Sequence, residues 1–163
     1  MTRMEESWLT AGPDWYGFHG RLVHTLASLA EDEFLVISRR DVNRYVQFAA
    51  QGSDGMRVET TANTYLEPWE QLAVGDLLAL DRLGWTPPTS PLATSPEHDP
   101  HGSPNYFRDW PTPVPHGEIA CLAVATLTVV HRVDDFDLLA YDAFHATGRP
   151  IDLPELGLAR PGT

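Results

Sequence analysis

The sequence predicts an α+β fold, in which helices pack on an antiparallel sheet of three to five strands. Two observations predict it. Some segments have apolar residues at every third or fourth position, as on one side of a helix, and others alternate apolar and polar residues, as strands do. Three alternating or apolar segments are also joined by links too short for a crossover, which indicates an antiparallel meander. The predicted order is α-β-β-β-α, a proline-rich insertion, and then α-β.

The 163 residues predict a single domain. Residues 1–13 are expected to be a lead-in, residues 14–146 the α+β domain with its insertion at 86–117, and residues 147–163 a tail rich in Gly and Pro. The lead-in has no apolar run of the signal-peptide type, and the single cysteine excludes an internal disulfide. These features favour the cytoplasm, and the single cysteine also fits an exported protein that needs no disulfide bridge.

The first helix follows Asp14, a residue type that caps helices. Its apolar stripe has spacings of three and four, whereas Gly17 and Gly20 weaken it by about 1 kcal/mol each. The stripe consists of Trp15, Phe18, Leu22, Leu26 and Leu29.

Three strand candidates come next, at 34–38, 44–51 and 56–62. Residues 39–43 form a short polar link, and residues 52–55 have a hairpin-turn composition. The alternation in the second and third strands implies that one face of the sheet is buried, while the other faces water or a bound molecule.

A second helix is expected to begin near Pro68, with Trp69 as the first residue of its apolar stripe and Leu83 as the last. Gly84 is suited to a left-handed C-cap, after which Trp85 would fold back onto the helix. The two prolines at 87–88 block its continuation.

The insertion at 86–117 contains nine of the 14 prolines of the chain. Its end is different, because residues 105–110 include three aromatic residues, and we expect this part to dock on the body of the domain. Residues 119–133 are predicted as a helix on length, although the β-branched residues at 124–130 would also suit a strand. Residues 138–144 are predicted as the last strand.

The charge balance excludes several chemistries. All eleven basic residues are Arg, and 23 acidic residues give a net charge of −12. Without Lys there is no P-loop lysine, Schiff-base lysine or lysine general base. The negative charge disfavours binding to nucleic acid and to an anionic membrane surface.

Five segments support a resemblance to a known family: 45–49 (YVQFA), 58–63 (VETTAN), 65–66 (YL), 83–85 (LGW) with Pro88, and 105–110 with its Asn and Trp. The chain resembles the actinobacterial proteins grouped as TY-Chap, which are peptide-binding chaperone-like domains related to type III secretion chaperones and to the YbjN family. The resemblance extends over residues 15–144. The long insertion between Trp85 and Asn105 departs from the compact family pattern.

The resemblance implies a secretion-chaperone-like fold and a non-enzymatic domain that forms a homodimer. Such a domain holds an extended segment of a peptide or protein partner through a sheet edge and aromatic anchors. The residues expected to bind the partner are aromatic or cationic: Trp85, Tyr106, Phe107, Arg108, Trp110, Arg44 and Arg57. The alternative for the aromatic residues is that they cap the core beneath the insertion. Arg39 and Arg40 are further candidates for contacts with charged groups.

Metal and catalytic interpretations are weaker, and we expect no metal and no cofactor. A cluster in the insertion has zinc-ligand chemistry, but a proline-flanked loop supplies no rigid frame. It consists of Glu97, His98, Asp99, His101 and His116. Cys121 with His131 or His116 could form a nucleophile pair, but a buried apolar role for Cys121 is favoured. The acids at 134–137 are predicted as a solvated turn, since they lack an EF-hand pattern, and Asp76 and Asp81 do not form a pair on one helix face.

Two other functions remain open from the residues. One is a small hydrolase with a pocket beneath the insertion, which would use acids, His and Arg. The other is an acidic immunity or interaction protein that masks a basic partner.

Overall fold

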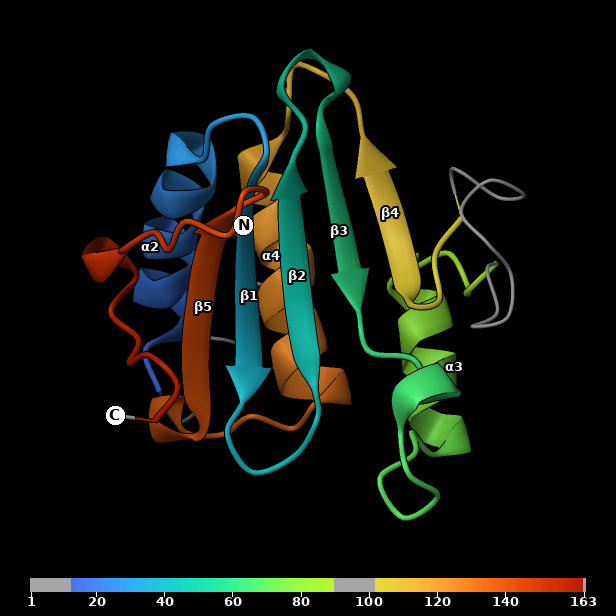
Figure 1. Cartoon of the computed structure of the whole chain (residues 1–163). Coiled ribbons are helices and arrows are strands. Elements are labelled where there is room, and N and C mark those ends of the chain that lie inside the picture. The colour runs from blue at the N-terminus through green and yellow to red at the C-terminus, as the bar shows by residue number, and fades with distance from the viewer. Residues whose placement is uncertain (1–12, 90–101, 163) are drawn as a thin grey trace.

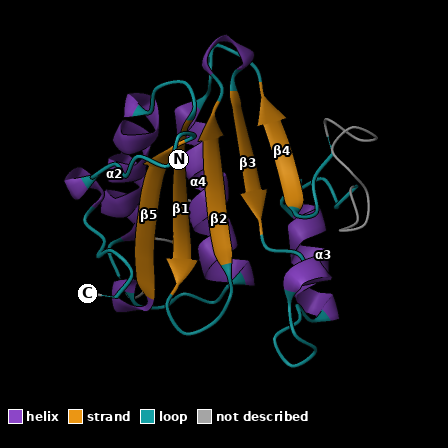
Figure 2. Ribbon diagram, viewed as in Figure 1, coloured by secondary structure: helices purple, strands orange, loops and turns teal. Residues whose placement is uncertain are grey.

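The computed structural model describes residues 13–89 and 102–162, and it has the predicted α+β architecture (Figures 1 and 2). Its main elements, in chain order, are α2 (Trp15–Ser28), β1 (Glu33–Arg39), β2 (Tyr45–Ala50), β3 (Met56–Thr60), α3 (Val74–Arg82), β4 (Tyr106–Trp110), α4 (His116–Ala125) and β5 (Leu139–His145). A π-helical turn, Thr126–Val130, continues α4. No helix in the described part of the chain is long and apolar enough to cross a membrane.

The five strands form one antiparallel sheet in the order β4-β3-β2-β1-β5 (Figure 2). β1, the second strand from one edge, pairs Val36 with Gln47 of β2 and with Asp142 of β5. This register places alternate residues of all five strands on the same face, because successive side chains of a strand point to opposite faces.

One face of the sheet is buried beneath α2 and α4, which lie on the same side of it (Figure 1). The apolar stripe of α2 packs there as predicted. Fully buried large side chains of this core come from the strands and from both helices: Phe18, Leu22, Leu26, Leu35, Ile37, Phe48, Met56, Ile119 and Leu127. The opposite face has no helix over it among the described residues.

Asp14 caps α2 as predicted. Its side chain accepts a hydrogen bond from the Gly17 amide at 2.9 Å. A Cβ atom at Gly17 would lie 2.3 Å from the Asp14 carboxylate, so the glycine leaves room for the cap.

The second helix begins later than predicted. α3 starts at Val74, and Trp69, which the stripe placed on its buried side, is 81% exposed. Two side chains account for the start: Asn63 Oδ1 accepts the Leu72 amide at 2.6 Å, and Asp76 accepts the Ala73 amide at 3.1 Å. These bonds hold residues 72–73 outside the helix.

The C-terminus of α3 agrees with the prediction. Gly84 adopts φ 91°, the left-handed conformation that glycine favours. The chain then turns back, so that the Trp85 amide donates to the Leu80 carbonyl at 3.1 Å.

Two segments that the sequence placed outside the regular structure belong to it. The aromatic end of the insertion forms β4 and pairs with β3, with Val58 opposite Arg108. Residues 149–159, within the predicted tail, run along β5, where the Ile151 amide donates to Ala143 at 2.9 Å. Leu156 is fully buried, and its carbonyl accepts from Arg21 of α2, so the apolar residues of this segment complete the core.

The long C-terminal helix is confirmed, although it ends in the π-helical turn. The Thr126 and Thr128 hydroxyls donate to carbonyls four residues back, at 2.7 and 2.8 Å. Arg132 then adopts φ 56°, which is uncommon outside glycine. The π-helical turn and the conformation of Arg132 therefore place His131 and Arg132 at one end of the sheet.

Candidate functional site

The sheet face opposite the helices, which we call the open face, is the main candidate surface. The strand register defines its side chains: Phe34, Val36 and Ser38 of β1, Tyr45, Gln47 and Ala49 of β2, Arg57 and Glu59 of β3, Phe107 and Asp109 of β4, and Ala140, Asp142 and Phe144 of β5. Most of them are half-buried, since neighbouring strands shield their sides.

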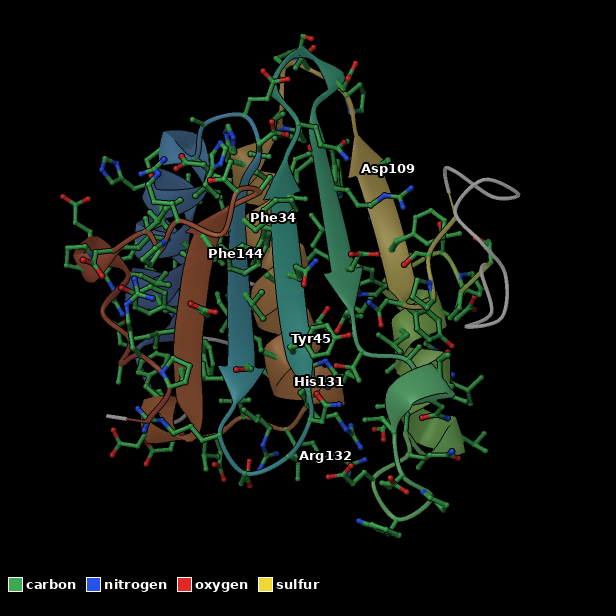
Figure 3. All side chains as sticks on the ribbon, in the orientation of Figure 1. Phe34, Tyr45, Asp109, His131, Arg132 and Phe144 are labelled. Atoms are coloured by element: carbon green, nitrogen blue, oxygen red, sulfur yellow. The ribbon has the colours of Figure 1, made fainter. Side chains whose placement is uncertain are left out.

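An aromatic pair lies on the β1–β5 half of the open face. The rings of Phe34 and Phe144 stack with centroids 5.3 Å apart and planes inclined by 16°. Figure 3 shows the two side by side on neighbouring strands. Val36 is half-buried beside them on β1. These residues give this half an apolar and aromatic surface, beside which the exposed Asp142 of β5 pairs with Arg160 at 3.3 Å.

The β3–β4 half of the open face is polar. Arg57 makes two hydrogen bonds to the Asp109 carboxylate, at 2.7 and 2.8 Å, and its guanidinium lies 4.7 Å from the Phe107 ring centroid. The Gln47 amide donates to Glu59 at 3.3 Å. These contacts hold Arg57 in one orientation.

Residues 102–105 lie against this polar half. Arg57 donates to the Gly102 carbonyl at 2.9 Å, and the Ser103 hydroxyl donates to Glu59. The Tyr45 hydroxyl donates to Asn105 Oδ1 at 2.9 Å. This segment covers part of β2 and β3, and none of these contacts involves the aromatic pair on β1 and β5.

The two sheet edges differ in what remains unpaired. Residues 149–159 occupy the β5 edge, where the Tyr141 amide donates to Ala159 at 2.9 Å. On the β4 edge, Phe107 and Thr86 exchange two hydrogen bonds of 3.0 Å. By alternation, the main-chain groups of Asp109 face outward, and no described residue pairs with them. The β4 edge thus offers one short site for an added strand.

The predicted partner-binding aromatics lie on different faces. Phe107 is on the open face, whereas Tyr106, Arg108 and Trp110 face the helix side, opposite the buried residues of β3. Trp85 is only 3% exposed. Its location matches the alternative that these residues cap the core.

Contacts on the helix side hold these residues in place. The Trp85 indole donates to the Thr126 hydroxyl at 3.0 Å. The Arg108 guanidinium lies 4.1 Å from the Trp110 ring centroid. Burial, together with the charge of Asp81, raises the pKa of Tyr106.

The structure places Cys121 beside His19, and His131 beside Thr60. His131 is buried, and its Nε2 lies 2.8 Å from the Thr60 hydroxyl. Cys121 is half-exposed, instead of buried as expected, and lies 3.5 Å from His19 Nε2. That nitrogen is also 3.1 Å from the Gly117 carbonyl, which only accepts.

The metal candidates divide between described and undescribed residues. Glu97, His98, Asp99 and His101 lie outside the described residues. Within residues 13–89 and 102–162, no three His, Cys, Asp or Glu side chains are grouped as metal ligands would be. The predicted turn at 134–137 is present, with Asp135 accepting from the Asp137 amide at 2.8 Å.

The sequence did not single out Phe34 or Phe144. Strand alternation could have found them, because Phe34 and Val36 share one face of β1 and Phe144 is two residues beyond Asp142 on β5. Their pairing depends on the β1–β5 register, in which they stand opposite each other. That register joins residues more than 100 positions apart.

One comparison with known proteins gave a match. A family model described as TY-Chap3, T3SS (YopN, CesT) and YbjN peptide-binding chaperone 3, matches residues 9–145. Neither the comparison with curated proteins nor that with solved structures returned a match.

Proposed function

Because the chain belongs to the TY-Chap3 family of peptide-binding chaperones, we propose that it binds an extended segment of a protein partner on the open face of its sheet. The family match over most of the chain carries this proposal. In this proposal, the protein is a non-enzymatic, cytoplasmic binding module that has no cofactor.

The aromatic pair supports the choice of surface. Phe34 and Phe144 are large, half-buried and already ordered by stacking on each other. Aromatic side chains of this kind supply much of the affinity at protein interfaces, because they bury large areas at little cost in rotamer entropy. Covering the remaining surface of both rings would contribute on the order of 1–3 kcal/mol.

The free main-chain groups of Asp109 support a second contact. A partner strand that pairs with Asp109 would extend the main-chain hydrogen bonding along the β4 edge, which Thr86 already forms with Phe107. Because Pro111 has no amide proton, pairing along this edge is limited to about one residue. Side-chain contacts on the open face would therefore dominate, with edge pairing as a minor contribution.

The net charge of −12 favours a neutral or basic partner, since it repels an acidic partner at long range. The proposal also includes a homodimer. A solution mass of twice the 18.1 kDa of the chain would support it, and a mass equal to one chain would exclude it.

The open face is tested with the double variant Phe34→Gln, Phe144→Gln. Overlapping peptides from proteins encoded next to the gene are first screened for binding to the wild-type chain. We expect the best peptide to bind the double variant at least about tenfold more weakly, since two anchors lose contact. Fluorescence anisotropy with the labelled peptide measures this.

The matched control is Tyr16→Gln, which removes an aromatic ring that is 53% exposed on α2, away from the open face. It should leave the affinity unchanged. Equal affinities of wild type and the double variant, with both folded by circular dichroism, would overturn the assignment of the binding surface.

A further inference from the structure

A small pocket lies where β1 ends and β2 begins, next to α3. Its volume is about 180 Å³. Water occupies ~30 Å³ per molecule in the liquid, so the pocket has room for a carboxyl group and its neighbouring atoms. Figure 3 shows His131 and Arg132 near Tyr45 at this end of the sheet. The lining residues are Arg39, Val42, Arg44, Asp76, Val130, His131 and Arg132.

Two of the three lining guanidinium groups are neutralised. Arg39 donates to both oxygens of Asp41, at 2.8 and 2.6 Å, and to the His131 carbonyl at 2.8 Å. Arg132 pairs with Asp76 at 2.9 Å. Asp76 also accepts the Ala73 amide, so its second oxygen is used as well.

Arg44 is different from these two. It is half-buried and donates to the Glu70 carbonyl at 2.9 Å, but no described carboxylate lies within 4.0 Å of it. Burial lowers the pKa of Arg44, as do the charges of Arg39 and Arg132, whereas the charges of Asp76 and Glu70 act in the opposite direction. The pocket therefore holds three guanidinium groups against two contacting carboxylates, in a protein with a large negative net charge.

His131 supplies a second unsatisfied group. It is 1% exposed, and its Nδ1 has no hydrogen-bond partner in the described part of the chain. Nε2 lies 2.8 Å from the Thr60 hydroxyl, which is also 2.8 Å from the Tyr45 carbonyl. Because the Thr60 hydroxyl donates its one proton to that carbonyl, Nε2 bears the imidazole proton and donates to Thr60, and Nδ1 is an unpaired acceptor. Leaving such a group unpaired costs about 1–3 kcal/mol.

The backbone at the pocket is also unusual. Arg132 adopts φ 56° directly after the π-helical turn and His131. Left-handed non-glycine residues and π-helical turns both cost stability and recur at functional sites. Here they place His131 and Arg132 against the pocket.

We propose that this pocket binds one carboxylate group of the partner peptide, with Arg44 as its principal contact. The inference rests on the proposed function, because it names the chemistry of the segment that is bound. A guanidinium fork matches the two oxygens of a carboxylate, and its four remaining N–H groups suffice for paired donation. A single negative charge matches the one guanidinium without a contacting carboxylate, whereas a phosphate would bring up to two.

The carboxylate can come from a C-terminus or from an Asp or Glu side chain, and three short probe peptides distinguish these sources. All are N-acetylated and share one neutral apolar sequence. One has a free C-terminal acid, one a C-terminal amide, and one a C-terminal amide with a central Glu. Binding is followed by NMR through the Arg44 Nε–H signal and the His131 ring signals.

We expect at least one acid-containing probe to shift both sets of signals in a saturable manner, while the amide probe without an acid does not. If only the free-acid probe shifts the signals, the pocket binds a C-terminal carboxylate. If only the Glu probe shifts them, it binds an acidic side chain. If both probes shift them, it binds a carboxylate of either source.

Arg44→Gln should weaken binding of the acid-containing probes about tenfold or more, and Arg44→Lys should weaken it by less, because Lys keeps the charge without the fork.

Arg149→Gln is the matched control, since it removes one exposed arginine elsewhere. Three results would overturn the proposal: no acid-containing probe binds at about 10 mM, the amide probe binds equally well, or inorganic phosphate binds and the acids do not. If Arg44→Gln does not fold, Arg44→Lys and the three probe peptides still test whether the pocket binds a carboxylate.

The two proposals fail in different ways. If the screened peptide binds the wild-type chain and Arg44→Gln alike, the pocket proposal fails and the open-face proposal stands. If the double variant at Phe34 and Phe144 binds that peptide normally while the acid-containing probes still shift Arg44, the open-face proposal fails and the pocket stands.

Discussion

His131 is the side chain whose chemistry depends most on its surroundings. Burial, with a contribution from the nearby charge of Arg44, lowers the pKa of His131 from 6.5 to about 3. Arg39 acts in the same direction, whereas Asp76 and the Tyr45 carbonyl oppose it. From the sequence alone, His131 was only a possible partner of Cys121. Its burial and its contact with Thr60 follow from the packing of α4 on the sheet.

The lowered pKa predicts a specific pH dependence of stability. Between pH 6.5 and 3 the unfolded chain binds a proton at His131 that the folded chain does not, so the stability due to this group is complete above pH 6.5 and decreases below it. From pH 7.5 to pH 5.0 the loss amounts to about 2 kcal/mol, at about 1.4 kcal/mol per pH unit.

The check compares the wild-type chain with His131→Gln, whose amide does not titrate. Urea unfolding at the two pH values gives the free energy of unfolding of each protein. The wild type should lose about 2 kcal/mol more than the variant. Equal losses would contradict the burial of a neutral imidazole.

Among the secondary-structure elements, β4 departs most from the expectation. Proline density made residues 86–117 resemble an insertion, and the three aromatic residues indicated only that its end would dock. Pairing with β3 makes β4 an edge strand. Strand alternation then places Phe107 on the open face and Tyr106 and Trp110 on the helix side. One sequence cluster thus contributes to two different surfaces.

The outward edge of β4 can be tested with two substitutions at Asp109. Asp109→Pro and Asp109→Ala both remove the ion pair with Arg57, but only Pro removes the outward amide proton. If a partner strand pairs there, Asp109→Pro should weaken peptide binding about three- to tenfold relative to Asp109→Ala. Calorimetry on both variants, after their thermal midpoints are compared, measures the difference. Identical affinities would exclude edge pairing at this position.

At the scale of the whole molecule, two features concern partner choice. The chain has a net charge of −12, while a local excess of positive charge lies in the pocket around Arg44. A neutral or basic segment with one carboxylate, at its C-terminus or in a side chain, matches both the negative net charge and the cationic pocket. The long-range field would bring such a segment to the protein, and the pocket would set its position.

The long-range attraction predicts a salt effect on the rate of association with a basic peptide. Raising the ionic strength from about 0.1 M to about 1 M shortens the Debye length from about 10 Å to about 3 Å. The association rate constant should fall about tenfold or more, with little change in the dissociation rate constant. Stopped-flow fluorescence measures both, and a neutral peptide with the same apolar residues is the control. A rate constant that does not fall with salt would argue against steering by the acidic surface.

The sequence by itself determined the elements whose evidence is local: α2 with its Asp14 cap, β1 to β3, the Gly84 cap of α3, the C-terminal helix and β5. Helical and strand periodicities span a few residues, so neighbours along the chain specify them. It also indicated that one face of the sheet would be left open. The tertiary structure decided which residues occupy that face, and it placed β4 and residues 149–159 at the edges.

Tertiary structure also assembled the pocket from the β1–β2 link, the start of α3 and the end of the π-helical turn. The physical reason is that strand register and helix docking join residues far apart in the sequence. Phe34 stacks on Phe144, and Arg44 lines the same pocket as His131, because the fold brings distant segments together, and no local pattern encodes those positions.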